Sequence, residues 1–429
     1  MNSKLVPVSE KELQTRIELN YRRLAEGDYY STENVFSPKD YDWYADKEGR
    51  ALLAFVSHYK TNGKSAPCMG FLMEHLQEHM NEEGYFGPVF ADKIHEQQLS
   101  GHSWLLRGLC EYYEAFGDEY SKNAVEKIAD NLYLKMRGCF STYPIERSKK
   151  DIGDVSGTQA EEINGWILSS DIGCAFMSID GLSHAYKILK KEDIKALLDE
   201  MITVYLGVDK VKLKAQTHCT LSAARGMLRM YGEMGEARYL KGACDIMKLY
   251  TEGGGMSETY QNLNWWGRAD TWTEPCAIVD SLMVACELYK AIGDEKYKTL
   301  AARIYHNGLA TAQRQNGGAG TDSVVVSGVE EYLYSKMYEA EFCCTMRLAE
   351  GLWYISVNKE LLTAKTDGCV TKKGRIYSDG DLIYAEIGGG AQDYVEKTAE
   401  VDGYKLSPIV KYYRLPKDVM ESSKQRILF

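Results

Sequence analysis

Apolar side chains recur at steps of three and four residues along most of the chain, which is the period of an amphipathic helix. The stripe that ends before Gly293 consists of Ile278, Leu282, Ala285, Tyr289 and Ile292. A glycine in this place can end a helix in the left-handed conformation, and the acidic residue after it suits the start of another helix. The pattern predicts two consecutive helices that fold back on each other.

Three segments repeat this arrangement of a helix end with Tyr, a glycine followed by an acidic residue, and a second amphipathic helix. Their turn glycines are Gly117, Gly235 and Gly293, and fainter copies lie around residues 48–80 and 175–205. Repeated helical hairpins must bury their apolar faces on neighbouring hairpins, either in an open solenoid or in a closed ring. Gly-rich, aromatic interruptions favour the closed ring. We therefore expect a mainly α fold, an (α/α)6 barrel whose loops meet at one mouth.

The texture changes after about residue 356, where short runs of β-branched and aromatic residues alternate with turn signals such as SDGD. We expect a barrel domain over residues 1–355 and a small C-terminal β-strand region over 356–429 that packs on it. This region is small for a complete independent sandwich. Completion of this region by a second copy of the chain would make the protein a homo-oligomer.

Charge and composition narrow the choice of partners. The formal net charge of −11 argues against nucleic acid and anionic membrane surfaces. The longest apolar run, ALLAFV, is too short to span a bilayer. An uncharged, sugar-like or small-molecule partner fits better. The N-terminal stretch lacks the apolar segment of an export signal, and the 11 Cys are an odd number, so we expect reduced thiols in the cytoplasm. An exported native form with its signal removed is the alternative.

Residues 251–276 form the least helical part of the expected barrel. Long irregular loops in compact domains usually carry function. Aromatic rings can stack on the apolar faces of sugars while a carboxylate transfers protons, which makes Glu258 a candidate. The candidate stacking residues are Trp265, Trp266 and Trp272. The alternative is that these Trp side chains fill the barrel interior.

The motifs TEPC and FCC together supply a candidate metal site. Pro275 favours the first turn of a helix, which places Glu274 at the cap and Cys276 just inside it. Cys343 and Cys344 are adjacent, so they can reach one ion only at a helix start or a bend. Three sulfur ligands and one oxygen ligand suit tetrahedral Zn2+. The alternative is four unconnected core residues, because free Cys is often buried.

The order MSETY, TEPCA, RIYHNGL and FCCTMRLAEGL resembles the β-L-arabinofuranosidase clan, glycoside hydrolase families 127 and 146. The resemblance covers most of residues 90–355 and implies an (α/α)6 barrel followed by β-sandwich material. It implies that Cys343 is the nucleophile and Glu258 the acid/base. The zinc ligands that it implies are Glu274, Cys276, Cys343 and Cys344. It also aligns His218 with a sugar-binding His of the family, and His102 lies near the place of another.

The implied activity is that of a retaining glycosidase that releases terminal β-L-arabinofuranose or a related sugar from plant-type glycans. The Cys343 thiolate would attack the anomeric carbon while Glu258 protonates the leaving oxygen. Two other readings stay open. One is a sugar epimerase or isomerase on the same kind of barrel, and the other is a non-catalytic, zinc-stapled carbohydrate-binding protein. An acidic sugar would need an Arg in the site, for which Arg268 and Arg347 are candidates.

Overall fold

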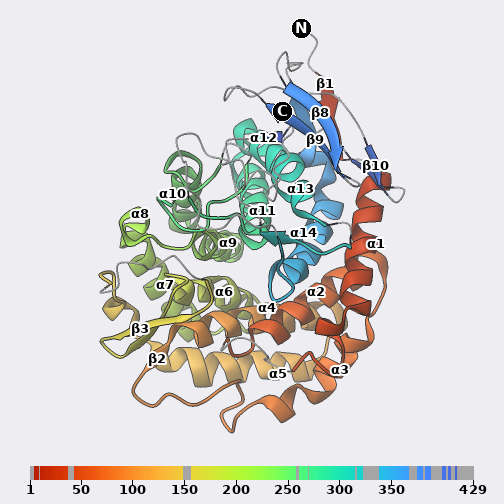
Figure 1. Cartoon of the computed structure of the whole chain (residues 1–429). Helices are drawn as coiled ribbons and strands as arrows, with labels where there is room; N and C mark the ends of the chain where they lie inside the picture. Colours follow the sequence, from red (N-terminus) through yellow and green to blue (C-terminus); the bar gives the residue numbers. More distant parts are fainter. Residues whose placement is uncertain are drawn as a thin grey trace. The chain divides into compact units, whose positions relative to one another are not determined.

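The chain divides into two compact units, each built mainly from helices (Figure 1). The first unit comprises residues 24–248 and 265–267, and the second comprises 1–23, 249–264 and 268–429. The structure is a computed structural model that describes residues 4–8, 10–36, 43–147, 156–257, 260–268, 270–314, 316–321, 338–366, 374–379, 382–387, 399–401, 404–406 and 411–412. The sequence predicts a different division, between a barrel domain over residues 1–355 and a β-strand region over 356–429. That division stays a prediction.

Helices of the first unit follow one another in hairpins. They are α2 (Asp46–Asn62), α3 (Pro67–His75), α4 (Glu96–Phe116), α5 (Glu119–Ile128), α6 (Ser178–Leu189), α7 (Glu192–Gly207), α8 (Lys210–Leu213), α9 (Thr217–Met234) and most of α10 (Ala237–Glu252). The expected glycine turns are confirmed. Gly117 and Gly235 end α4 and α9 at φ values of 66° and 68°, and each donates its N–H to the carbonyl four residues earlier. Asp118 then caps α5 by accepting from the N–H of Ser121.

Glycines set the packing of α2, α4, α6 and α9, which lie side by side in chain order. A Cβ atom on any of four glycines would lie no more than 2.6 Å from a backbone atom of the neighbouring helix or its start. The pairs are Gly49 with Leu105, Gly101 with Tyr44, Gly181 with Ser103, and Gly226 with Ile179. Residue numbers rise together along the contacting helices, so these helices are parallel. Their N-terminal ends therefore lie at the same end of the unit.

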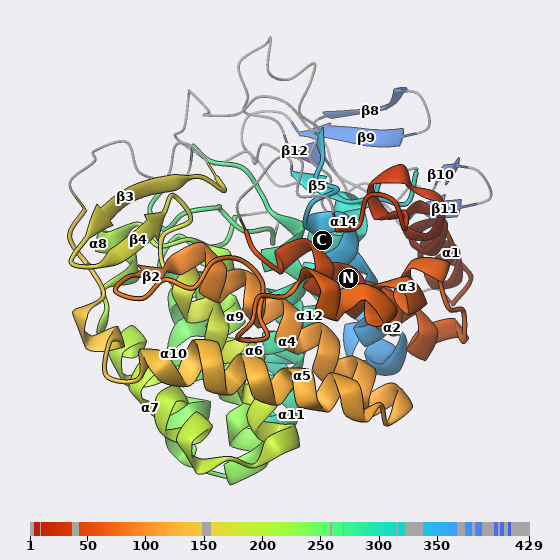
Figure 2. The same cartoon turned by 90° about the horizontal axis from the view of Figure 1, so that it is seen from below.

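A small sheet lies beside the start of α4. Its strand order is β2 (Ile94–His95), β4 (Trp166–Ser169) and β3 (Gln159–Ile163), with β2 parallel and β3 antiparallel to β4 (Figure 2). Glu96, which is fully buried, holds this region together because its carboxylate accepts from the Tyr143 hydroxyl at 2.7 Å and from the Ser169 N–H at 2.9 Å. The hydrogen bonds offset the cost of burying the charge.

Helices of the second unit are α1 (Glu10–Glu26, mostly in this unit), α11 (Pro275–Ile292), α12 (Glu295–Arg303), α13 (Ala310–Ala312) and α14 (Cys344–Asn358). A π-helical segment, Ile304–Leu309, continues α12. Gly293 ends α11 at a φ of 77°, and Asp294 caps α12, which confirms the third expected hairpin turn. Of the expected stripe on α11, however, Ile292 is 45% exposed. It sits in the last turn, where the helix leaves the core.

Strands of the second unit are short and come mostly after α14. β1 (Lys4–Val6) pairs with β7 (Ala364–Thr366), and β5 (Gly320–Thr321) pairs with β6 (Tyr338–Glu339), both antiparallel. The remaining strands form the sheet β12–β9–β8 and the pair β10–β11: β8 (Gly374–Asp379), β9 (Leu382–Ile387), β10 (Ala399–Val401), β11 (Tyr404–Leu406) and β12 (Lys411–Tyr412). The described elements after residue 363 are thus strands, as the sequence predicts.

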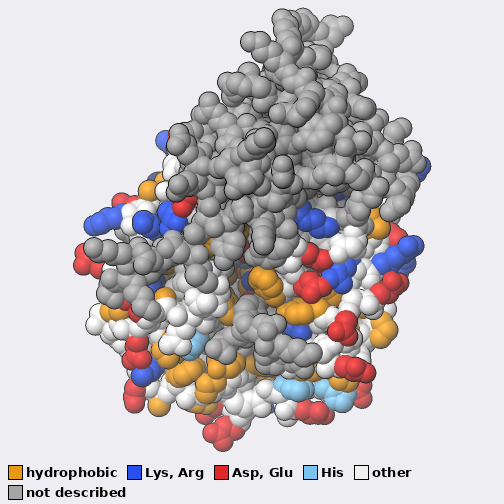
Figure 3. All heavy atoms as spheres, in the orientation of Figure 1, with side chains coloured by type: hydrophobic (Ala, Val, Ile, Leu, Met, Phe, Trp, Pro, Cys, Tyr) orange, Lys and Arg blue, Asp and Glu red, His pale blue; other side chains and the backbone are white. Residues whose placement is uncertain are grey.

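The described surface shows charges of both signs. On the face drawn in Figure 3, Lys and Arg side chains are intermixed with Asp and Glu over the coloured part, and these side chains form no basic stripe of the kind that binds nucleic acid. Among the described helices, none is both long and apolar enough to cross a lipid bilayer.

Candidate metal centre and active site

The N-terminus of α11 positions two of the four expected ligands. Glu274 caps the helix in an extended conformation (φ −132°, ψ 113°), Pro275 occupies the first helical position and Cys276 follows. Pro suits that position because its fixed φ matches the helix and its missing N–H would have no partner there. The residue before it, Glu274, does have an N–H, which donates to the Asn262 side-chain oxygen at 2.7 Å. The predicted helix start at Pro275 is confirmed.

The N-terminus of α14 positions the other two. Cys343 lies just before the helix with φ −147° and ψ −61°, and Cys344 is its first residue. The Cys343 N–H donates to the carbonyl of Ala340, and the Cys343 carbonyl accepts from the N–H of Arg347. This change of backbone direction between adjacent residues lets both thiols face the same point, as the sequence argument requires.

The four side chains converge. The sulfur atoms of Cys276 and Cys344 are 3.8 Å apart, and those of Cys343 and Cys344 are 3.3 Å apart. One ligand atom from each of these three Cys and from Glu274 can be chosen so that all lie within 4.8 Å of one another, and all four residues are buried. These separations are too long for a disulfide, whose sulfurs are about 2.05 Å apart. Ligands about 2.3 Å from a tetrahedral zinc ion lie about 3.8 Å from one another.

The donor set fits a divalent, thiophilic cation such as Zn2+. Burial and the neighbouring thiols raise the pKa of Cys343 and Cys344 well above the ordinary value, so without a cation these thiols are protonated. A bound cation reverses this preference because it pairs with thiolates. The positive ends of α11 and α14 both point toward the ligands and favour the same negative charge.

An ion pair lies one turn below the thiols and joins the same two helices. Arg347 of α14 bonds Asp280 of α11, and it also pairs with Glu350. Arg347 is therefore committed to the core rather than to a sugar carboxylate. Arg268 likewise pairs with Asp270, with nitrogen–oxygen distances of 2.8 Å. Neither Arg supports the expectation of an acidic sugar.

The three Trp residues of the 251–276 segment differ from the expected exposed platform. Trp265 and Trp266 belong to the first unit and have no exposed surface. Their indole N–H groups donate to the Ser170 carbonyl at 3.3 Å and to the Thr220 hydroxyl at 3.1 Å. Both side chains are core residues, which is the alternative that the sequence left open. Trp272 belongs to the second unit and is 5% exposed, so its role as a stacking residue stays a prediction.

His102 is a core residue as well. It is fully buried in α4, its Nδ1 bonds the Gln98 carbonyl at 2.7 Å, and its Nε2 accepts from the Phe86 N–H at 2.9 Å. Burial lowers its pKa to about 4, so the ring is neutral. Both nitrogens are engaged with backbone, which corrects the expectation that His102 binds a sugar.

His218 lies in the described part of the chain, whereas Glu258 does not. His218 lies in the first turn of α9, where its ring stacks on Trp104 with centroids 5.7 Å apart. The Arg50 guanidinium also lies 4.1 Å from the centroid of the Trp104 ring, a cation–π contact. A sugar-binding role for His218 stays a prediction. Glu258 falls outside the described residues, so its acid/base role also stays a prediction.

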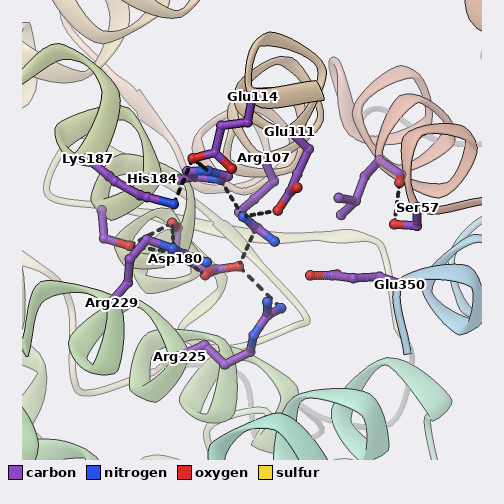
Figure 4. Close-up of polar contacts among 12 residues, drawn as sticks. Ser57, Arg107, Glu111, Glu114, Asp180, His184, Lys187, Arg225, Arg229 and Glu350 are labelled. Atoms are coloured by element: carbon purple, nitrogen blue, oxygen red, sulfur yellow. Dashed lines mark hydrogen bonds and ion pairs between the residues drawn. The ribbon is translucent and has the colours of Figure 1, made fainter. Parts of the chain in front are cut away.

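A second group of acidic and His side chains joins the C-terminal halves of α4 and α6 (Figure 4). In it, Glu111 pairs with Lys60 at 2.7 Å, Glu114 pairs with Lys187 at 2.7 Å, and His184 accepts from Arg107. Burial opposes ionisation of Glu111, but the neighbouring cations still hold its pKa at about 2. Cations of the protein already neutralise these carboxylates, so the group is a structural ion-pair network rather than a metal site.

Sequence reasoning missed Asn262. It lies 12 residues before the ligand whose N–H it accepts, and it is fully buried. A lone Asn in an irregular segment carries no motif, and Asn is usually read as a turn residue. The position of this side chain could be found only from the folded structure.

Comparison with known proteins places the fold. No family model and no curated protein matches the sequence. Solved structures do match: a GH127 β-arabinofuranosidase (13% identity, TM-score 0.55, 95% of this chain and 65% of that chain), and an unsaturated glucuronyl hydrolase specific for heparin (12%, 0.56, 82% and 98%). A third is the cellobiose 2-epimerase of Bacillus thermoamylovorans B4167, with 12% identity and a TM-score of 0.54 over 81% of this chain and 98% of that chain.

At such low identity these likenesses concern the fold alone. The chain spans less than two thirds of the β-arabinofuranosidase structure and nearly the whole of the epimerase. The expected fold class is confirmed: the chain has the (α/α)6-barrel fold of these proteins, mainly α, with a short C-terminal β region.

Proposed function

We propose that this protein is a retaining glycoside hydrolase with a Cys nucleophile and a resident zinc ion. The observation that carries the proposal is the convergence of Glu274, Cys276, Cys343 and Cys344 at two helix starts. The four residues come from motifs nearly 70 residues apart in the sequence. Apolar packing explains why Cys side chains are buried, but it does not explain why the Glu274 carboxylate is buried beside them.

Cys343 is the proposed nucleophile because it is the thiol with access to solvent. It is 7% exposed, whereas Cys276 and Cys344 have no exposed surface. It also lies before the helix rather than inside it, so its side chain is less constrained. Cys276, Cys344 and Glu274 are the residues that keep the ion in place. The zinc, when bound, supplies the positive charge that keeps the Cys343 sulfur anionic at neutral pH.

The proposed reaction has two steps. The Cys343 sulfur attacks the anomeric carbon, the glycosidic C–O bond breaks, and Glu258 donates a proton to the departing oxygen. The sugar is then held on Cys343 through a C–S bond. Glu258 takes a proton from water, the water oxygen bonds the anomeric carbon, and the thiolate leaves. Two inversions give retention of configuration.

The proposed substrate is a terminal β-L-arabinofuranoside or a related sugar. Support comes from the sequence resemblance and from the fold shared with a GH127 β-arabinofuranosidase. That structure is longer than this chain, so parts of its substrate site need not have a counterpart here. A sugar epimerase is the competing function, because the same fold occurs in a cellobiose 2-epimerase.

Trapping the covalent intermediate is the decisive experiment. The Glu258→Gln variant should be mixed with an activated aryl β-L-arabinofuranoside, quenched in acid, digested and analysed by mass spectrometry. We expect one pentosyl group on the peptide that contains Cys343. Cys343→Ser should lower kcat by at least about a thousandfold. Cys244→Ser serves as the matched control, because Cys244 lies on α10, is not one of the four converging residues and should keep wild-type activity when replaced.

Three results would contradict the proposal in different ways. A pentosyl group on a carboxylate would reject Cys343 as nucleophile. Conversion of a free sugar to its epimer, without release of the aryl alcohol, would favour the epimerase. Zinc at one ion per chain with binding of sugars but no turnover on a panel of aryl glycosides would indicate a non-catalytic, zinc-stapled carbohydrate-binding protein.

A further inference from the structure

Residues 256–257 and 260–262, which precede the ligand helix α11, lie side by side, and we call these two described arms the 256–262 turn. Met256 and Asn262 pair as an antiparallel bridge, and the Ser257 N–H donates to the Gln261 carbonyl at 2.7 Å. Gln261 returns a hydrogen bond from its N–H to the Ser257 hydroxyl at 3.2 Å. Ser257, Gln261 and Asn262 are all buried. The two arms are therefore fixed to each other by hydrogen bonds, and residues 258 and 259 lie outside the described chain.

Tyr260 anchors this turn to the helix after α11. Its φ is +60°, a left-handed conformation that is unusual for a residue with a side chain. Its hydroxyl accepts from the Arg303 guanidinium at 2.8 Å. Its carbonyl lies so close to the π-helical segment that a Cβ at Gly308 would be 2.8 Å from the Tyr260 oxygen and 3.1 Å from Ile278 Cγ2. Tyr260 is thus held twice, through its hydroxyl by Arg303 and through its carbonyl by the close approach of Gly308.

Asn262 joins the other end of the turn to the metal centre. Its side-chain oxygen accepts the Glu274 N–H at 2.7 Å, and the Asn262 side chain is fully buried. This bond satisfies the backbone of a ligand at the position where a helix start has no internal partner. Partners of this kind orient metal ligands, and their loss typically weakens metal binding about 10- to 100-fold.

We infer that Asn262 and Tyr260 are positioning residues that tie the 256–262 turn to the metal centre and to the π-helical segment. The inference rests on the proposed function in one respect only, since the proposed acid/base, Glu258, lies between the two arms in the sequence. Asn262 acts through Glu274, so its loss should disturb the metal. Tyr260 and Gly308 act on the turn, so a change there should disturb proton transfer and leave the metal in place.

Zinc affinity separates the two roles. The dissociation constant of Zn2+ would be measured by chelator competition for Asn262→Ala, Asn262→Asp and Gly308→Ala. We expect about 10- to 100-fold weaker binding for Asn262→Ala, recovery in Asn262→Asp because an acceptor is kept, and no change for Gly308→Ala. Asn358→Ala is the matched control, since Asn358 is also buried in this unit but donates to the Tyr354 carbonyl. Equal affinities in Asn262→Ala and Asn358→Ala would overturn the role of Asn262.

Leaving-group dependence tests the turn. We expect Gly308→Ala and Tyr260→Phe to slow the hydrolysis of aryl glycosides with poor leaving groups more than those with good ones, because protonation of the departing oxygen is impaired. Gly232→Ala, at a helical glycine with open space around it, is the control. An unchanged slope of kcat/KM against leaving-group pKa would overturn the role of Tyr260. If the protein hydrolyses nothing, the proposed function fails, while the zinc affinities still decide the role of Asn262.

Discussion

The Arg347 guanidinium donates to the Asp280 carboxylate at 2.6 Å, and neither side chain has any exposed surface. This ion pair joins α11 to α14 one turn below the thiols. Removal of one partner leaves a buried charge uncompensated, which typically costs about 3–5 kcal/mol. We predict that Arg347→Met lowers the free energy of unfolding by that amount in urea denaturation. The exposed pair Lys241–Asp245 is the control. Lys241→Met should change the free energy of unfolding by less than about 1 kcal/mol.

The metal-free protein should lose stability at high pH. The pKa of Cys343 and Cys344 is raised in the folded state by burial, so the unfolded chain releases their protons first. The stabilisation is complete below the unfolded pKa of about 8.5 and is lost progressively above it. We predict a falling urea midpoint between pH 8 and 10 for the metal-free protein. The zinc-loaded protein should not show this fall, because its sulfurs are already thiolates.

Zinc binding should release protons at neutral pH. Cys343 and Cys344 are protonated in the metal-free state and must ionise to bind the ion. Calorimetric titration in buffers of different ionisation enthalpy should therefore detect about two or more protons per zinc at pH 7. Affinity should increase with pH over the same range. Binding that is independent of pH would show that these sulfurs are not ligands.

Glu48 should make the protein less stable as the pH rises from 5 to 8. This carboxyl lies in the first turn of α2, and burial raises its pKa to about 7. The raised pKa adds to the free energy of unfolding, fully so below pH about 4.3, the pKa of Glu in the unfolded chain. This addition is lost as the pH rises through 7. We predict that Glu48→Gln is about 2–3 kcal/mol more stable than wild type at pH 8 and equal to it near pH 4.5. The same substitution at the exposed Glu82 is the matched control.

Replacement of His102 should affect stability rather than the reaction. Its ring nitrogens bond the Gln98 carbonyl and the Phe86 N–H in the core. His102→Ala leaves these groups without the ring, at a cost of about 1–3 kcal/mol in urea denaturation. The pH profile of kcat should not change at temperatures where the variant is folded. By contrast, His218→Ala should raise KM if His218 holds a sugar hydroxyl.

The sequence contains enough to predict the hairpins and to single out the four residues that converge at the starts of α11 and α14. In the three repeated segments a glycine followed by an acid marks a helix turn, since Gly117, Gly235 and Gly293 each end a helix. Pro275 marks a helix start by local stereochemistry alone. Glu274 and Cys276 lie at this start, and Cys343 and Cys344 lie at the start of α14, so short-range rules place each pair and only the meeting of the two pairs needs the fold.

Other features depend on contacts between distant segments and could not be predicted. Residues 96–111 of α4 are buried on every side, so a stripe of apolar positions says little about which face of such a helix meets the core. Trp265 and His102 look the same in sequence whether they face a sugar or the interior. Asn262 meets Glu274 only because the intervening segment turns back on itself.

Gly351 lies beyond Arg347 on α14, and a Cβ there would be 2.8 Å from Val279 Cγ2 on α11. The missing methyl group lets the two helices approach closely a few residues from the place where both begin. A bulkier side chain would act as a wedge and enlarge the triangle of sulfur atoms at the helix starts. The size of ion that the proposed site would accept is therefore adjustable from a position outside the four converging residues, which offers a route to variants selective for larger thiophilic cations.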